Sequence, residues 1–231
     1  MRKLWIIGEF HPYYELYNHR LPKEFRKILK RIVEMEETLI RSIKPDTVFV
    51  EYPEDWGLEE ELKYRAEFFR LSEEECGRKL SEKEVETIMR RGYGERMRFY
   101  NRIRKNSRLI FLEDKDEYIK AGETLIEALK AGEKDPYSKG EFQLSARERE
   151  RRFYERVKDE DFRRGVVICG LAHVIKESDS GGLKEAEWIE RLEKILEVRV
   201  FLIDLEEAGE GIIRELSLEQ SKARDSQSSS F

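Results

Sequence analysis

The sequence predicts an α/β fold, in which a mostly parallel sheet of about five strands carries helices on both faces. Short apolar runs alternate along the 231 residues with longer segments of helical periodicity, which is the pattern of a parallel sheet. The apolar runs show no alternation of apolar and polar residues, as expected of strands that are covered on both faces. A chain of this length holds one sizeable core and a smaller insertion.

The predicted strands are short and are separated by predicted helices. The strands are expected over residues 4–7, 47–50, 109–112, 166–169 and 198–203. The helices of the core are expected over residues 22–43, 116–131, 143–163 and 183–196. The first helix ends at Lys44-Pro45-Asp46, because proline disfavours helical backbone in the residue before it.

Residues 54–107 differ from the rest of the chain. They are highly charged and helical in pattern, with predicted breaks near Cys76-Gly77 and at Gly92-Tyr93-Gly94. A crossover between parallel strands usually needs only one helix, so we expect a helical insertion over the carboxyl ends of the strands. The predicted organisation is a single domain over 1–206 (core 1–53 and 108–206, insertion 54–107) and a mobile C-terminal tail over 207–231, which is Ser-rich from Ser217.

The composition indicates a globular protein. Charged residues make up 41% of the chain and apolar residues 39%, which is enough for a core. The abundance of Glu, Lys and Arg is typical of heat-adapted proteins. Two cysteines do not make a disulfide framework, and Cys169 is expected to be a buried, inert thiol. No apolar run approaches the length of a membrane span, so we expect a cytoplasmic protein without a membrane partner.

Two of the three histidines stand in the same local motif. Gly8 precedes His11 by three residues after the first strand, and Gly170 precedes His173 by three after the fourth. A glycine at such a point permits close approach of the backbone to a ligand. His19 lacks this setting and is expected at the surface.

Carboxylates also follow the strands. Ligands of parallel α/β sheets bind beyond the carboxyl ends of the strands, where Glu9, Glu51 and either Glu113 or Asp114 are expected beside the histidines. Imidazole and carboxylate ligands bind manganese, zinc or iron, and His11, His173 and Glu9 are the predicted metal ligands. Without a metal, a histidine paired with a carboxylate can activate water as a general base.

The paired motifs resemble the TraB/TIKI/ChaN/erythromycin-esterase-like superfamily. Its N-terminal Gly-Glu-x-His matches Gly8-Glu9-Phe10-His11, its glutamate at the end of the second strand matches Glu51, and its second Gly-x-x-His matches residues 170–173. Its helical Arg-Asn/Asp motif aligns best at Arg149-Glu150, with Arg147 and Arg151 as alternative registers. The resemblance covers roughly residues 4–53 and 108–175.

The resemblance implies a site of the hydrolase kind. Members include metal-dependent peptidases, esterases and a haem-binding lipoprotein, so it implies a fold and a site more than a reaction. Carried over, His11, Glu9, Glu51 and His173 form the pocket. Arg149 holds a substrate carboxylate or stabilises a tetrahedral intermediate. From their places at the strand ends, we also expect Gly8, Gly170 and Asp114 to contact the substrate. We therefore expect a metal-assisted or His/Glu-based hydrolase of a small molecule or peptide.

Two other functions are open at this point. The same pocket suits a non-catalytic protein that binds haem, a metal or a small anionic ligand. Residues 90–108 are rich in arginine with interleaved Tyr93, Phe99 and Tyr100, a pattern that attracts phosphates and stacks bases. The formal net charge of -5 disfavours this nucleic-acid role, and a solvated helix face paired with acidic residues 73–86 explains the same pattern.

Overall fold

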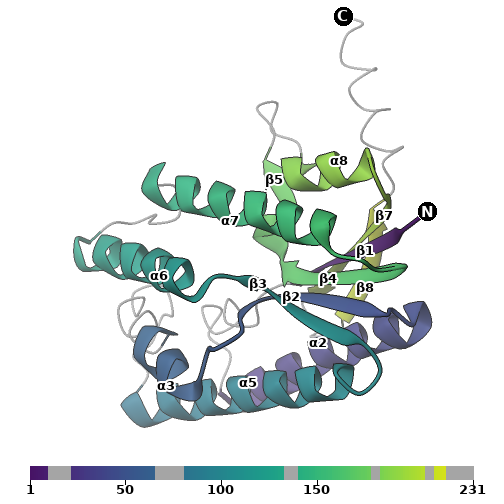
Figure 1. The fold of residues 1–231 in the computed structure, drawn as a ribbon. Coiled ribbons are helices and arrows are strands. Elements are labelled where there is room, and N and C mark those ends of the chain that lie inside the picture. Colours follow the sequence, from purple (N-terminus) through teal and green to yellow (C-terminus); the bar gives the residue numbers. More distant parts are fainter. Residues whose placement is uncertain (10–21, 66–80, 133–139, 178–182, 206–210, 217–231) are drawn as a thin grey trace, which may run out of the picture.

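The protein is an α/β structure built on one six-stranded sheet, as a computed structural model shows (Figure 1). The structure describes residues 1–9, 22–65, 81–132, 140–177, 183–205 and 211–216. The predicted residues His11, His19 and Cys76 lie outside these ranges. None of the described helices is long and apolar enough to cross a membrane.

The sheet has the strand order β3-β2-β4-β1-β7-β8. Its strands are β1(Lys3–Glu9), β2(Thr47–Pro53), β3(Arg108–Glu113), β4(Arg164–Gly170), β7(Glu197–Leu205) and β8(Gly211–Leu216). The first five are parallel and correspond to the five predicted strands, whereas β8 runs antiparallel to β7. The prediction of a mostly parallel sheet is therefore confirmed. The prediction of a mobile tail was wrong over residues 211–216, because these residues form an edge strand.

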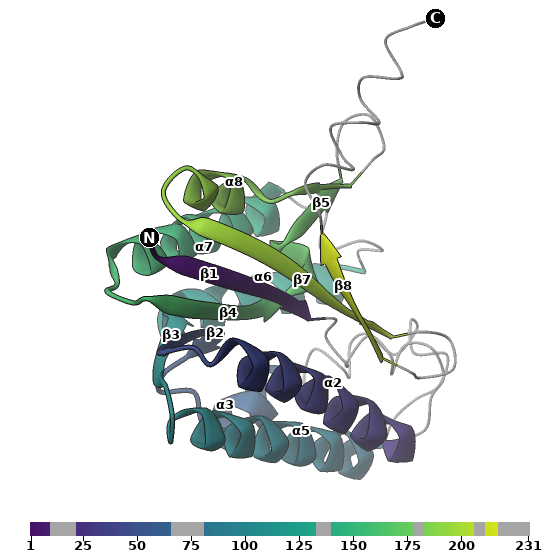
Figure 2. The same cartoon turned by 90° about the vertical axis from the view of Figure 1, so that its right-hand side faces the viewer.

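Helices cover both faces of the sheet. Those longer than one turn are α2(Pro22–Ile43), α5(Glu82–Ile103), α6(Lys115–Lys130), α7(Gly140–Asp159) and α8(Glu187–Glu193). Figures 1 and 2 show α2 and α5 side by side on one face and α7 and α8 on the other, whereas α6 lies beside α7 beyond the end of β3. Short elements complete the described fold: α3(Leu58–Glu60), a π-helical turn over Glu61–Arg65, a 3-10 turn over Leu171–His173, and the hairpin β5(Ile175–Glu177) and β6(Leu183–Glu185).

The predicted insertion takes a different position in part. Helix α5 runs unbroken through Gly92 and Gly94, and it covers a face of the sheet beside α2 instead of lying over the strand ends. Its apolar residues explain this position, because Val85, Ile88 and Phe99 are buried in the same core as β2. Of the described part of the insertion, α3 and the π-helical turn lie beyond the end of β2, where Glu61 accepts hydrogen bonds from Tyr52 and Trp56.

Successive residues of a strand enter two different cores. In β4, Val166 and Ile168 belong to the core under α2 and α5, whereas Val167 and Cys169 belong to the core under α7 and α8. This arrangement explains the continuous apolar run, because both faces of the strand are covered. Cys169 is a free, fully buried cysteine, and burial raises the pKa of its thiol well above the usual value.

In the sheet, β4 lies between β2 and β1. The connections that follow β1 and β2 place α2 and α5 on one face of the sheet, and the connection that follows β4 places α8 on the other, beside α7, which precedes β4 (Figures 1 and 2). The loops at the carboxyl ends of β1, β4 and β2 therefore diverge. A crevice at such a point is where open α/β sheets bind ligands.

Gly8 is closely packed at this point. A methyl group on Gly8 would lie 3.0 Å from Val174 Cγ2 and 3.2 Å from Leu202 Cδ2. The sequence analysis assigned the space beside Gly8 to a ligand. In the structure, the side chain of Val174, the residue after His173, occupies this space.

We expect Gly8→Ala to lower the free energy of unfolding by about 1–3 kcal/mol, because the added methyl group overfills a close-packed core. Urea unfolding measures the change. Gly122→Ala in α6 is the matched control, since nothing lies within 4 Å of its added methyl group. This control should stabilise the helix by about 0.5–1 kcal/mol. Equal effects of the two substitutions would contradict the packing role of Gly8.

Candidate active site

Four neighbouring strands bring polar groups to one edge of the sheet. Glu9, Glu51 and Glu113 stand at or near the ends of β1, β2 and β3, and His173 follows β4 in the 3-10 turn. Glu9 pairs with Gly170 in the strand register, so the two Gly-x-x-His motifs begin side by side. The structure thus brings Glu51, Glu113 and His173 together around Arg149 and places the backbone of Glu9 beside Gly170.

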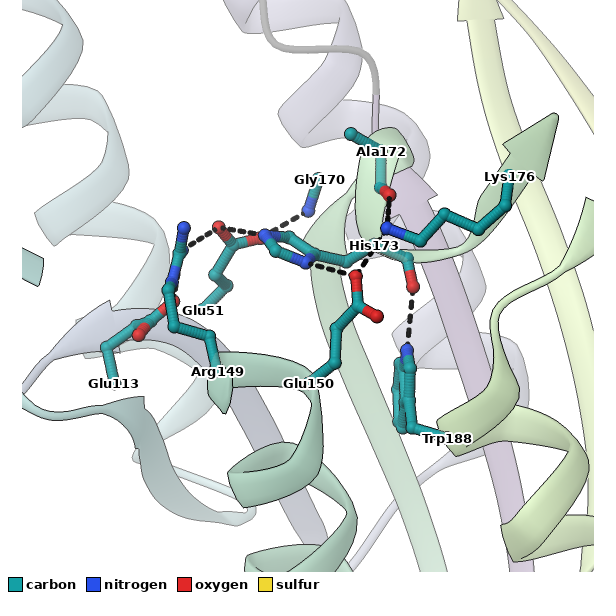
Figure 3. A network of polar contacts seen from close by, with 9 residues as sticks. All are labelled: Glu51, Glu113, Arg149, Glu150, Gly170, Ala172, His173, Lys176 and Trp188. Carbon is teal, nitrogen blue, oxygen red and sulfur yellow. Dashed lines mark hydrogen bonds and ion pairs between the residues drawn. The ribbon is translucent and has the colours of Figure 1, made fainter. Parts of the chain in front are cut away.

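Glu51 is the hub of this cluster (Figure 3). Its Oε1 accepts a hydrogen bond from Arg149 Nη2 at 2.8 Å and lies 3.3 Å from His173 Nε2. Its Oε2 accepts the backbone N–H of Gly170 at 2.6 Å. The glycine motif therefore presents its backbone to a carboxylate of the protein. These donors hold the Glu51 carboxylate in one orientation.

Arg149 reaches the same cluster from α7. Its Nε donates to Glu113 Oε1 at 2.7 Å, its Nη2 also pairs with Glu113, and only 7% of the residue is exposed. Of the alternative registers, Arg151 pairs with Glu155 at the surface and Arg147 is exposed. Arg149 is therefore the one of these three arginines that contacts the strand-end carboxylates.

His173 is buried between two carboxylates. Its Nδ1 lies 3.1 Å from Glu150 Oε1, opposite the contact of its Nε2 with Glu51. Burial on its own lowers the pKa of His173, but the charge of Glu51 and the hydrogen bonds to both carboxylates outweigh burial and raise this pKa to about 9. The ring is therefore an imidazolium at neutral pH, with an N–H toward each carboxylate (Figure 3).

Glu150 is a site residue that sequence reasoning treated only as a departure from a motif. Burial raises its pKa, but the hydrogen bonds and charges of His173 and Lys176 prevail and lower it. Lys176 Nζ donates to Glu150 at 2.5 Å and to the carbonyl of Ala172 at 2.7 Å. The available signal was its position beside Arg149, on the helix that precedes β4.

The backbone of His173 is fixed as well as its ring. Trp188 Nε1 donates to the carbonyl oxygen of His173 at 2.7 Å, and the ring of Phe153 meets the imidazole edge-on at 5.4 Å. Both aromatic residues are buried in the core under α7 and α8. The imidazolium therefore has little freedom to turn.

Asp114 has a structural contact. Its carboxylate accepts the backbone N–H groups of Asp116 and Glu117 and so caps α6. Between the two residues that the sequence left open, the structure places Glu113 in the cluster and Asp114 at the helix terminus. A substrate contact of Asp114 has no support in this geometry.

The basic stretch 90–108 is largely paired with acidic residues. Ion pairs join Arg90 to Glu86, Arg98 to Glu95, Arg102 to Glu37 and Arg108 to Glu160. Arg96 turns inward and donates to Glu9. The stretch is therefore not a continuous free cationic face, which weakens the nucleic-acid alternative.

The described residues do not fit the predicted metal site. Glu9 faces the guanidinium of Arg96, and both ring nitrogens of His173 face carboxylates. Within the described part of the chain, no group of three or more His, Cys, Asp or Glu side chains is arranged to hold a metal ion. The third predicted ligand, His11, lies outside the described residues, so a manganese, zinc or iron site stays a prediction.

Comparisons with models of known families, with curated proteins and with solved structures found no match. The superfamily resemblance therefore remains a prediction that rests on the motifs themselves.

Removal of Arg149 should be costly for stability. We expect Arg149→Met to lower the free energy of unfolding by about 3–5 kcal/mol, because Glu51 and Glu113 would stay buried without their shared cation. Arg151→Met on the same helix is the control and should change stability by less than about 0.5 kcal/mol. Similar losses in both variants, measured by urea unfolding, would contradict a central role of Arg149.

The pH dependence of stability should report the imidazolium. The folded pKa of His173, about 9, exceeds the unfolded value of about 6.5, so its ion pairs contribute fully below pH 6.5 and are lost as pH rises through 9. We expect the wild type to lose on the order of 3 kcal/mol over this range, measured by urea unfolding. His173→Gln should lose much less, and parallel curves for the two proteins would refute the assignment.

Proposed function

We propose that the protein is a hydrolase of an ester or amide bond, with its site at the carboxyl ends of β1, β2, β3 and β4. One observation carries the proposal: the His173 imidazolium, held between Glu51 and Glu150, with Arg149 on the same Glu51. A buried, oriented histidine at the point where the sheet connections diverge is typical of a reaction centre. The resemblance to a superfamily with hydrolases supports the same class.

His173 suits the role of general acid in this reaction. The group that leaves an ester or amide carries negative charge, and an imidazolium can give it a proton. Glu150 holds the ring through Nδ1 at 3.1 Å. The proton on Nε2, whose contact with Glu51 is longer at 3.3 Å, is the one that passes to the leaving group, and the raised pKa keeps it on the ring at neutral pH until then. Hydrolysis also requires a base that takes a proton from water, and Glu9 and His11 are the candidates.

Arg149 supplies positive charge beside the general acid. The tetrahedral intermediate of hydrolysis bears an oxyanion, and a fixed guanidinium lowers the energy of such charge in a buried site. The same group suits a carboxylate of a peptide or small-molecule substrate. A cytoplasmic substrate of this kind is part of the proposal.

Activity on a panel of esters and peptides tests the proposal. We expect His173→Gln to lower kcat by about 10²–10⁴-fold, since it removes the proton donor. The kcat/KM of the wild type should fall above about pH 9, where His173 loses its proton. The control Glu155→Gln changes an exposed partner on α7 and should keep full activity. Full activity of His173→Gln would contradict the proposed role.

Metal content distinguishes a metal-assisted hydrolase from a metal-free, His/Glu-based one. Mass spectrometry is done on protein purified without a histidine tag, for the wild type and for His11→Ala/His173→Ala. Near-stoichiometric metal that disappears in the double variant would contradict a metal-free site. A stoichiometric bound ligand, combined with no hydrolysis in the panel, would instead favour a binding protein.

A further inference from the structure

The side chain of Arg96 points inward from the basic stretch 90–108, toward the end of the sheet. Its Nη2 donates to Glu9 Oε2 at 2.6 Å, and its Nη1 donates to both oxygens of Glu36, at 3.1 Å and 2.9 Å. The side chain of Arg96 is 11% exposed, and Glu36 is completely buried. One guanidinium therefore joins β1, α2 and α5.

A second ion pair between α5 and α2 is exposed and serves as a comparison. Arg102 on α5 pairs with Glu37 on α2, and the two side chains are 47% and 26% exposed. Such a pair loses little hydration, whereas a buried pair loses most of it and rarely adds net stability. Linking α5 to α2 thus does not explain why Arg96 and Glu36 are buried.

The contact with Glu9 supplies an explanation. Glu9 lies opposite Gly170 in the strand register, and the N–H of Gly170 donates to Glu51. The backbone of Glu9 therefore adjoins the cluster that holds His173, while its side chain faces α2 and α5. A carboxylate that accepts a proton must be held in a fixed orientation, and the guanidinium of Arg96 holds Glu9 while Glu36 fixes the guanidinium.

We propose that Arg96 is a positioning residue that holds Glu9 as the proton acceptor for the attacking water; this inference rests on the proposed function. Glu9 takes one proton from water as the water oxygen bonds to the carbonyl carbon. The bond to the leaving group then breaks, and this group departs with the electron pair and the proton of His173. Solvent carries the proton away from Glu9 and returns one to His173.

Enzyme kinetics test the positioning role. We expect Arg96→Met to lower kcat by at least about 100-fold with KM within about twofold, because the base is misplaced while the substrate contacts remain. Arg96→Lys should recover at least about tenfold of that loss, since a cation is restored. The matched control Arg102→Met should stay within about twofold of the wild type. A loss in KM alone, or equal kcat for Arg96→Met and Arg102→Met, would overturn the inference.

A second measurement does not depend on activity. Urea unfolding of the wild type, Arg96→Met, Glu9→Gln and the double variant forms a double-mutant cycle. Non-additive midpoints are expected, and additive midpoints would show that Arg96 serves only Glu36 and overturn the inference. If Arg96→Met does not fold, Arg96→Lys completes the cycle. If the wild type hydrolyses nothing, the proposed function fails, and the cycle alone decides whether Arg96 holds Glu9.

Discussion

The need of buried carboxylates for cations governs this edge of the sheet. Five glutamate side chains at this edge are each no more than 9% exposed: Glu9, Glu36, Glu51, Glu113 and Glu150. Burial of an ionised carboxylate without a partner costs several kcal/mol, so each must have a cation nearby or take up a proton. Arg96, Arg149, Lys176 and the His173 imidazolium are the cations nearby, but at Glu36 and Glu113 burial outweighs them and raises the pKa of both carboxyls.

The cations come from helices on opposite faces of the sheet. Arg96 belongs to α5 on one face and Arg149 to α7 on the other, and both reach carboxylates at the strand ends. The two cores thereby meet at one polar layer, which ties the ends of β1, β2 and β3 to the helices. A reaction at this layer would use charges that are already in place before a substrate binds, which is the condition for electrostatic catalysis.

The fold and the carboxylates of this polar layer could be predicted from local sequence. Unbroken apolar runs predict covered parallel strands, and parallel strands bring Glu9, Glu51 and Glu113 to one edge. The cationic half was harder to predict, because Arg96 stands among many arginines and only its position four residues after the buried Gly92 and three before Phe99 marks it as inward. Glu36 likewise follows Leu29, Ile32 and Val33 on the buried side of α2. Which of several arginines meets which carboxylate depends on long-range packing, and the edge strand β8 depends on pairing with β7.

The central claim is that His173 is a fixed imidazolium whose two nitrogens face Glu51 and Glu150. Nitrogen-15 NMR of the imidazole rings tests this claim directly, with His173→Gln to assign the signal. The account predicts two protonated ring nitrogens in His173 at pH 7, with titration near pH 9. A neutral ring at pH 7, or a ring nitrogen shifted by a bound metal, would contradict it.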